Sequence, residues 1–218
     1  MADYHPYIYD RDNKRIVGDF EGAYRDCPDV WASQHDTHLL KFQWVAWEAA
    51  RRGPATRVLD VGAGYGDFVA LLASRGVDAS GVEISASAVD QGRTRHGLGD
   101  ERLRVGDLKA GLEAGDASAD LIVVYGVFWF LLDRLDFCLA ELDRVLAPGG
   151  ELFCSLSMTA DPIGKEIIAD YPDFVQVLRR RFEVVEAFVT HDAAALALGA
   201  PLAECPTDMV VRCRKRGG

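Results

Sequence analysis

The sequence has few basic side chains for its length, and they nowhere form a long run. Lys and Arg number 24 against 34 Asp and Glu, which gives a formal net charge of −10 at pH 7, and the most basic stretch is "RCRKR" at 212–216. Because a surface of this sign repels a phosphate backbone, the composition predicts no nucleic acid partner. We interpret the basic stretch as a solvated strand end.

Long apolar runs and paired cysteines are also missing. No segment approaches the roughly 20 apolar residues that cross a bilayer, and the first residues, "MADYHPYIYDRDNKR", are polar where a secretory signal has its apolar region. The 5 cysteines include no C-x-x-C pair, and an odd count argues against a complete disulfide framework. We therefore expect a cytoplasmic protein without a membrane partner.

What the chain does contain is an alternation of apolar and amphipathic segments. From "TRVLDVG" at 56–62 to "ELFCSLSM" at 151–158, continuous apolar stretches are separated by helical patterns, which is typical of a parallel sheet covered by helices on both faces. Two later strand-like segments, "FEVVEAFVTH" and "DMVVRCRKR", have no convincing helix between them. The order predicts an α/β fold whose last strand runs antiparallel to the others.

Two segments precede the first of these strands. Residues 1–35 are aromatic and polar without periodicity, and they predict an irregular arm. The following stretch, "HDTHLLKFQWVAWEAARRG", predicts a helix that ends before a Gly-Pro pair. We expect this helix to pack on the sheet through Leu40, Trp44 and Trp47, with Asp36 or Thr37 as its N-cap.

The stretch "RVLDVGAGYGD" at 57–67 places a glycine turn at the end of an apolar strand. Its glycines let a ligand approach the backbone without interference from Cβ atoms. A dinucleotide site has a similar turn, but its spacing is G-x-G-x-x-G rather than G-x-G-x-G, and Asp67 would occupy the helix N-terminus that a pyrophosphate uses. The turn therefore favours a nucleoside ligand without phosphate, with an NAD-dependent oxidoreductase as the alternative.

Acidic residues end three successive predicted strands. Asp60, Glu83 and Asp107 are each separated from the next by roughly one strand-helix unit. In an open α/β sheet, ligands gather at the carboxyl ends of the strands. A carboxylate after the second strand can accept hydrogen bonds from both hydroxyls of a ribose, which makes Glu83 the candidate nucleoside reader. Asp107 can accept a hydrogen bond from the exocyclic amine of an adenine.

Four motifs, "VLDVGAGYGDF", "GVEIS", "VGDL" and "RVLAPGGEL", occur in an order and spacing that resembles class I S-adenosylmethionine-dependent methyltransferases of the small-molecule type, over residues 38–158. The resemblance implies a Rossmann-like, seven-stranded, mostly parallel sheet with helices on both faces and an antiparallel last strand. It also implies an N-terminal arm or lid over 1–35, a methyltransferase domain over 36–218, and S-adenosylmethionine as cofactor, with S-adenosylhomocysteine as product. By this resemblance the cofactor-binding residues are Asp60, Gly62, Ala63, Gly64, Gly66, Glu83, Ile84, Asp107, Leu108, Tyr125 and Gly126.

The segment after the fourth strand of this pattern, "YGVFWFLLD", bears on the methyl acceptor. It has neither the Asn/Asp-Pro-Pro-Tyr/Phe signature of enzymes that methylate base amines nor the Pro-Cys pair of the cytosine type. Many small-molecule enzymes of the resembling class carry His where Trp129 and Phe130 stand. We expect these aromatic residues to wall an apolar acceptor pocket together with Trp31 and Gln34 of the arm.

Histidines outside that segment are the candidates for a general base. They are His35, His38 and His191, and no tight cluster of histidines and acids predicts a metal site. The prediction is methyl transfer from S-adenosylmethionine to an oxygen or nitrogen of a small molecule, in bacterial secondary metabolism by association with an Arg-, Ala- and Gly-rich composition. The alternatives are an NAD-dependent oxidoreductase and a non-catalytic cofactor-binding partner or regulatory subunit.

Overall fold

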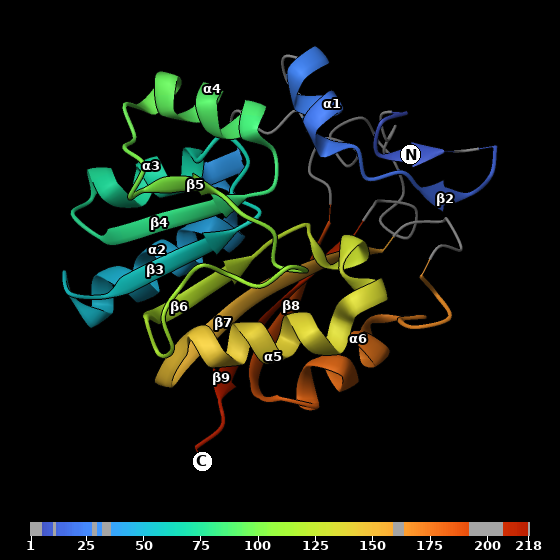
Figure 1. Ribbon diagram of the computed structural model, residues 1–218. Coiled ribbons are helices and arrows are strands. Elements are labelled where there is room, and N and C mark those ends of the chain that lie inside the picture. The colour runs from blue at the N-terminus through green and yellow to red at the C-terminus, as the bar shows by residue number, and fades with distance from the viewer. Residues whose placement is uncertain are drawn as a thin grey trace.

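The structure is a computed structural model that describes residues 6–10, 12–27, 30–31, 36–158, 164–191 and 207–217. Its centre is a seven-stranded sheet with the order β5-β4-β3-β6-β7-β9-β8 (Figure 1). Its strands are β3 (Arg57–Val61), β4 (Asp78–Glu83), β5 (Leu103–Val105), β6 (Ala119–Val124), β7 (Leu146–Met158), β8 (Phe182–His191) and β9 (Thr207–Lys215). Neighbouring strands are parallel from β5 to β7, whereas β9 is antiparallel to both β7 and β8. The predicted fold and its antiparallel last strand are confirmed.

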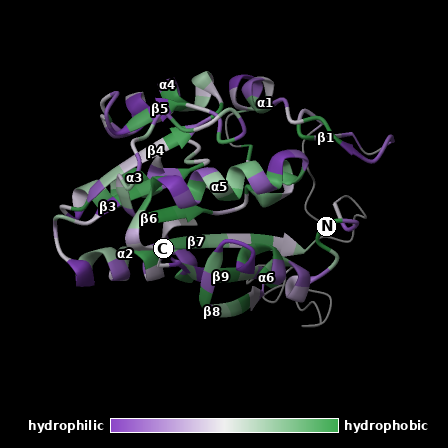
Figure 2. Cartoon of the chain, turned by 60° about the horizontal axis from the view of Figure 1, so that its bottom comes forward, coloured by the Kyte–Doolittle hydropathy of each residue, from purple (hydrophilic) through white to green (hydrophobic). Residues whose placement is uncertain are grey.

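Helices cover both faces of this sheet, because its strands alternate their apolar side chains between two cores. In β6, Leu121 and Val123 pack with one pair of helices, whereas Ile122 and Val124 pack with another. The first pair is α2 (Leu40–Arg52) and α3 (Asp67–Ser74), and the second is α5 (Leu135–Val145) and α6 (Tyr171–Arg179). Figure 2 shows mainly apolar central strands and helices that carry both kinds of residue. In the described ranges, no helix combines the length and apolarity that crossing a bilayer requires.

Side-chain caps and left-handed glycines set the helix ends. Ser85 caps α4 (Ala86–His96) by accepting a hydrogen bond from the Ala88 N–H at 3.1 Å, and Gly97 ends that helix with φ 65°. Asp170 caps α6 in the same way through the Asp173 N–H at 2.9 Å. Three short 3₁₀ helices, η1 (Asp36–His38), η2 (Phe128–Phe130) and η3 (Leu132–Arg134), lie in the connections. The glycine turn and the caps together place the strand ends around one opening.

The helix α2 begins later than the sequence pattern predicts, and it packs only partly through the predicted face. Its N-cap is Leu39, which makes no side-chain capping hydrogen bond, so the prediction of Asp36 or Thr37 as cap is wrong. Leu40 is 63% exposed and Trp47 is 59% exposed. The buried residues are Val45, Ala46, Glu48 and Ala49. Trp44 packs on the sheet as predicted, with its ring edge to face against Phe153 of β7 at 5.1 Å. Leu40 and Trp47 do not, because the charged Glu48, which pairs with Arg212, takes a buried position on this helix.

A buried ion cluster joins α2 to the carboxyl-terminal part of the sheet. Arg212 on β9 pairs with Glu151 on β7 at 2.9 Å and with Glu48 on α2 at 3.1 Å, and Arg52 also pairs with Glu151 at 2.5 Å. The side chains of Arg212, Glu48 and Glu151 are 11%, 2% and 1% exposed. The interpretation of the basic stretch as a solvated strand end is therefore wrong, since its first arginine is a buried anchor.

The described part of the N-terminal arm is more ordered than its sequence predicts. It holds a short hairpin of β1 (Tyr9–Asp10) and β2 (Arg15–Ile16), followed by the helix α1 (Phe20–Asp26). Asp19 caps α1 by accepting a hydrogen bond from the Gly22 N–H at 2.8 Å. Figure 1 shows α1 beside α4, on the side of the sheet where the strands end. The arm is thus placed over the region where a ligand of this fold would lie.

Candidate functional site

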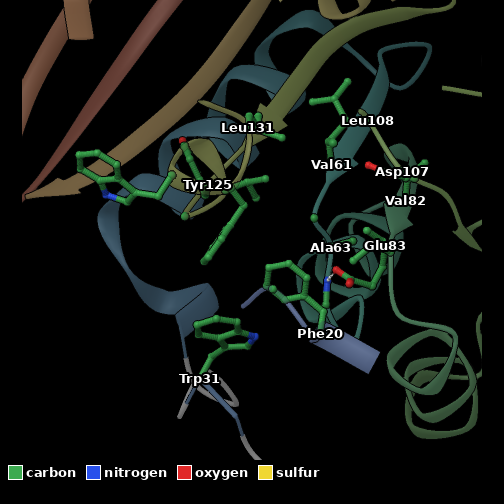
Figure 3. A pocket seen from close by; sticks show the side chains of 18 of the residues that line it. Phe20, Trp31, Val61, Ala63, Val82, Glu83, Asp107, Leu108, Tyr125 and Leu131 are labelled. Carbon is green, nitrogen blue, oxygen red and sulfur yellow. Dashed lines mark hydrogen bonds between the residues drawn. The ribbon is translucent and has the colours of Figure 1, made fainter. Parts of the chain in front are cut away.

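A cavity of about 840 Å³ opens at the carboxyl ends of β3, β4 and β6, between the sheet and the arm (Figure 3). Its lining comes from the glycine turn, the ends of these strands, the first turn of α2, the η2 and η3 region and the arm. Most of the predicted cofactor residues line it: Asp60, Gly62, Ala63, Gly64, Glu83, Ile84, Asp107, Leu108, Tyr125 and Gly126. Gly66 does not line the cavity; it is the N-cap of α3. We call the part near Glu83 and Asp107 the nucleoside half.

The glycine turn forms the floor of the nucleoside half. Gly62 has φ 80°, a conformation that side chains disfavour, and a Cβ there would lie 2.5 Å from Cγ2 of Val127. A Cβ at Gly64 would lie 3.0 Å from the hydroxyl oxygen of Tyr24 on α1. The turn is therefore pressed between the segment after β6 and the arm, and only a residue without a side chain leaves its backbone open to the cavity.

Glu83 ends β4 with a carboxylate that is held in place from two sides. It accepts a hydrogen bond from the Gly64 N–H at 2.9 Å and another from the Ser85 N–H at 3.0 Å. The residue is 5% exposed, and burial raises the pKa of its carboxyl group, while these backbone donors act in the opposite direction. A carboxylate has about four acceptor positions, so the two remaining ones can bind the hydroxyls of a ribose.

Asp60 lies beside Glu83 at the end of β3. Within the described part of the chain its carboxyl group has no hydrogen-bond partner, and it is 6% exposed. Burial and the neighbouring charge of Glu83 raise the pKa of Asp60 to about 7. Two buried carboxyl groups without a cation between them are costly. The pair therefore favours a ligand that brings positive charge into the nucleoside half.

The far end of the nucleoside half fits a planar base. Asp107 accepts a hydrogen bond from the Lys109 N–H through one oxygen at 2.8 Å, which leaves the other for a donor in the cavity. Ile84 lines the cavity and is 44% exposed, so it offers an apolar surface to the face of a base. Leu108 is buried beside it. All three residues line the cavity, and their contacts with an adenine stay a prediction.

The other part of the cavity, which we call the aromatic half, is walled by rings from the arm and from the segment after β6. The rings of Phe20 and Phe130 meet edge to face with centroids 4.8 Å apart, and Trp31 lies 6.4 Å from Phe20 and 6.5 Å from Phe130. Trp129 also lines the cavity and donates a hydrogen bond from Nε1 to the Ser157 carbonyl oxygen at 2.8 Å. Trp31, Trp129 and Phe130 thus line the cavity, as predicted.

A ring contact joins the arm to the glycine turn, and hydrogen bonds join it to α4. Trp31 Nε1 donates to the Tyr24 hydroxyl at 2.8 Å, and the Tyr24 ring meets the Tyr65 ring edge to face at 5.1 Å. The Glu21 carboxylate accepts from the Ser85 hydroxyl at 2.7 Å and from the Ser87 N–H at 3.1 Å. The arm therefore closes the cavity over both halves by contacts with the helix that follows Glu83.

The predicted histidine bases do not line the cavity where the structure describes them. His38 is exposed on η1, and His191 is exposed at the end of β8. His35 and Gln34 lie outside the described residues. A role for any of these side chains in proton removal or acceptor binding stays a prediction.

The site also contains residues that sequence reasoning missed. Phe20, Tyr24, Lys41 and Phe42 all line the cavity. Phe20 and Tyr24 come from a segment without periodicity, and only the capping pattern of Asp19 with the following residues signals a helix there. Lys41 and Phe42 lie in the first turn of α2, where the pattern indicates only packing on the sheet.

Comparisons with known proteins agree with this geometry. Residues 59–154 match the family described as "Methyltransferase domain". The chain is 32% identical over 125 residues to the ubiquinone/menaquinone biosynthesis C-methyltransferase UbiE of Brucella anthropi, covering 53% of this chain and 46% of that protein. It is 34% identical over 144 residues to the biotin biosynthesis bifunctional protein BioHC of Cellvibrio japonicus, covering 66% of this chain and 27% of that protein. The chain thus spans less than half the length of these curated relatives.

Solved structures share the fold at low sequence identity. The N-methyltransferase NodS of Bradyrhizobium japonicum, in complex with S-adenosylhomocysteine, superposes with a TM-score of 0.62 at 16% identity, covering 90% of this chain and 100% of that chain. A TehB-like S-adenosylmethionine-dependent methyltransferase of Corynebacterium glutamicum gives a TM-score of 0.64 at 22% identity, covering 88% and 98%.

The sheet order, the glycine turn and the acids at successive strand ends define a nucleoside-binding α/β enzyme of the Rossmann-like type. Together with the match of residues 59–154 to a methyltransferase domain, these features support a class I S-adenosylmethionine-dependent methyltransferase. The residues of the cavity fit S-adenosylmethionine as the cofactor. Glu83 has acceptor positions left for the hydroxyls of the ribose, and a nearby cation would stabilise the carboxylate of Asp60. The glycine turn leaves no room for a Cβ. The methyltransferase match over residues 59–154 also argues against the NAD-dependent alternative.

Proposed function

We propose that this chain transfers a methyl group to a small, largely apolar molecule held in the aromatic half of the cavity. The supporting observation is that one cavity contains both a nucleoside half with buried acids and an aromatic half walled by Phe20, Trp31 and Phe130. Its volume of about 840 Å³ suits two small ligands rather than a polymer. The acidic net charge of −10 also favours such an acceptor over nucleic acid.

When bound, S-adenosylmethionine supplies an electrophilic methyl group, and the chain supplies position and a dry environment. Glu83 and Asp107 orient the nucleoside, so that the end nearer Tyr125 and Gly126 faces the aromatic half. The rings of Phe20 and Trp31 exclude water from the path of transfer. Holding two reactants about 3 Å apart in line removes much of the entropic barrier to displacement. A histidine base, with His35 as the candidate outside the described residues, would add to this for a hydroxyl acceptor.

The arm over residues 1–35 acts in this proposal as a lid. Its described part contributes Phe20, Tyr24 and Trp31 to the cavity, and Glu21 attaches it to α4 through Ser85 and Ser87. Ligands of this size can reach an enclosed site only if such a cover opens. The domain that the arm covers comprises residues 36–218.

The atom that receives the methyl group in this proposal is an oxygen or nitrogen. The names of similar proteins extend the proposal to carbon. UbiE is named as a C-methyltransferase and NodS as an N-methyltransferase. The Arg-, Ala- and Gly-rich composition supports a place in bacterial secondary metabolism. Phenols, amines and activated carbon acids therefore form the acceptor panel.

Two measurements test the proposal. Calorimetry with S-adenosylhomocysteine should show binding, and NAD at the same concentration should show none. Incubation with S-adenosylmethionine carrying an isotopically labelled methyl group and the acceptor panel, followed by mass spectrometry, should yield a labelled small molecule. If S-adenosylhomocysteine binds but only added protein or nucleic acid becomes labelled, the small-molecule acceptor is wrong. If it does not bind, the cofactor site is wrong.

A further inference from the structure

Lys41 is one of two cationic side chains that line the cavity in the described part of the chain. Lys41, in the first turn of α2, lines the cavity, and the other cation in the lining, Lys109, is paired with Asp133 at 3.2 Å beside Asp107 in the nucleoside half. The rings of Phe42 and Tyr125 lie near its ammonium group. A charged group beside rings is costly unless it is paired and hydrogen-bonded, so the partners of Lys41 decide what it can do.

Neighbouring residues hold the ammonium group of Lys41 in place. Asp208 on β9 accepts its hydrogen bond at 2.9 Å, with side-chain exposures of 19% for Lys41 and 16% for Asp208. Ser157 on β7 donates to the other Asp208 oxygen at 3.2 Å. The Tyr125 hydroxyl donates to the Lys41 carbonyl oxygen at 3.0 Å, which fixes the backbone as well. The charge is thus positioned before any ligand arrives.

This ammonium group still has donors to offer. A lysine ammonium has three N–H donors, and within the described residues Asp208 accepts from one of them. Nζ lies 5.5 Å from the centroid of the Tyr125 ring and 5.6 Å from that of the Phe42 ring, and rings accept no conventional hydrogen bond. Tyr125 directly follows β6, and both it and the next residue, Gly126, line the cavity where the resemblance places the sulfonium. The free donors are therefore close to the point of methyl transfer.

Resting on the proposed function, we propose that Lys41 binds the ionised oxygen of the acceptor, and that the acceptor is a planar aromatic phenol or enol. The aromatic half holds the ring, and the ammonium group favours the oxyanion over the neutral hydroxyl. On binding, the hydroxyl releases its proton to solvent. An electron pair of the oxyanion then forms the new O–C bond to the methyl group, the S–C bond breaks, and its electron pair stays on the sulfur as a neutral thioether.

The opposite charge pattern, a cationic amine recognised by an acid, has weaker support. Glu166 is the acidic side chain that lines the aromatic side of the cavity, and it is exposed, in contrast to the held Lys41. A protonated amine would also approach a sulfonium of the same sign, and it would carry no electron pair for the methyl group. An anionic oxygen is attracted both by Lys41 and by the sulfonium.

Binding of 4-nitrophenol in the presence of saturating S-adenosylhomocysteine tests this role, because its anion absorbs visible light and its neutral form does not. The wild-type chain should bind the anion and lower the apparent pKa of the bound phenol. Lys41→Met should weaken this binding by about tenfold or more. Lys41→Arg should restore most of it. Affinity for S-adenosylhomocysteine should stay within about twofold in every variant, since Lys41 lies outside the nucleoside half.

The matched control ligand is 4-nitroanisole, which has the same ring but no ionisable oxygen. It should bind the wild-type and Lys41→Met chains alike. If Lys41→Met does not fold, the double variant Lys41→Met, Asp208→Asn removes both charges of the pair and takes its place. Equal binding of 4-nitrophenol by wild type and variant overturns the proposal, and so does a wild-type chain that binds S-adenosylhomocysteine but leaves the phenol spectrum unchanged. Loss of S-adenosylhomocysteine binding would instead contradict the proposed function.

Discussion

The carboxylate of Glu83 accepts a hydrogen bond from the backbone N–H of Gly64 at 2.9 Å, so the acid at the end of β4 and the glycine turn after β3 form one unit. The same carboxylate also accepts a hydrogen bond from the N–H of Ser85, and the side chain of Ser85 caps α4. The residue that we propose binds the ribose thus also holds the glycine turn in place.

Replacing Glu83 by Ala should lower cofactor affinity about tenfold to a hundredfold, because charge-assisted hydrogen bonds to the ribose are lost. Titration calorimetry with S-adenosylhomocysteine measures this. Glu113→Ala, at an exposed position, serves as the control and should bind as the wild type does. An unchanged affinity in Glu83→Ala would refute the ribose assignment.

Cofactor affinity should depend on pH through Asp60, whose pKa is raised to about 7 in the cofactor-free chain. The cation of S-adenosylmethionine favours the carboxylate, so affinity should rise as pH increases through about 7 and level off above it. Calorimetry between pH 5.5 and pH 8.5 measures the slope. Asp60→Asn should remove it, and a wild-type affinity that is flat over this range would contradict the assignment.

The same residue makes a prediction about folding. In the unfolded chain Asp60 titrates near the ordinary value of 3.8, and in the folded chain near 7. Between these values the folded state binds more protons, so the contribution of Asp60 to the free energy of unfolding falls as pH rises from about 4 to about 7. In thermal melts without ligand, the Tm of Asp60→Asn should therefore exceed that of the wild type by the largest amount at pH 8. A difference in Tm that does not grow with pH would speak against a buried, protonated Asp60.

Loosening the arm should expose it to proteolysis. Glu21→Ala removes the acceptor for the Ser85 hydroxyl and the Ser87 N–H, while leaving the rings of Phe20 and Trp31 in place. Trypsin cleavage after the exposed Arg25 should become several-fold faster, since local opening limits it. Added S-adenosylhomocysteine should slow cleavage in the wild type if the arm covers the ligand. Identical cleavage rates for variant and wild type would show that these contacts do not hold the lid.

Breaking the ion cluster should destabilise the whole domain. Arg212→Met leaves Glu48 and Glu151 buried with fewer cationic partners, and a loss of about 3 kcal/mol in the free energy of unfolding is expected. Urea denaturation measures it, with Arg181→Met, an exposed arginine just before β8, as the matched control. If the free energy of unfolding fell no more than in the control, the ion cluster would not stabilise the fold.

The strand ends of the site could be predicted from the sequence because their signals are local. A run of apolar residues, a glycine turn and a terminal acid all lie within a few positions of one another, as at Asp60 and Gly62, and parallel strands bring such ends to one edge. The antiparallel last strand, whose pairing joins distant residues, could be predicted only from the resemblance and from the missing helix between the last two strands.

The aromatic half could be predicted only in part, because it depends on contacts between segments far apart in the chain. Trp129 and Phe130 follow a recognisable strand, but Phe20 meets Phe130 only once the arm folds back over the sheet. The rotation of α2 depends on Arg212, which lies on the last strand, and that rotation decides that Trp47 is exposed. Hydrophobic periodicity alone carries no information about such a distant charge.

The joining of α2 to β9 also has a consequence for how the protein is made on the ribosome. The helix leaves the exit tunnel early, but Glu48 gains the guanidinium of Arg212 only after the last strand of the sheet has been synthesised. Until then, Lys41 on the same helix also lacks its partner, because Asp208 belongs to that strand. A nascent chain can therefore assemble its glycine turn well before it can complete the aromatic half, and acceptor binding is a property of the finished polypeptide alone.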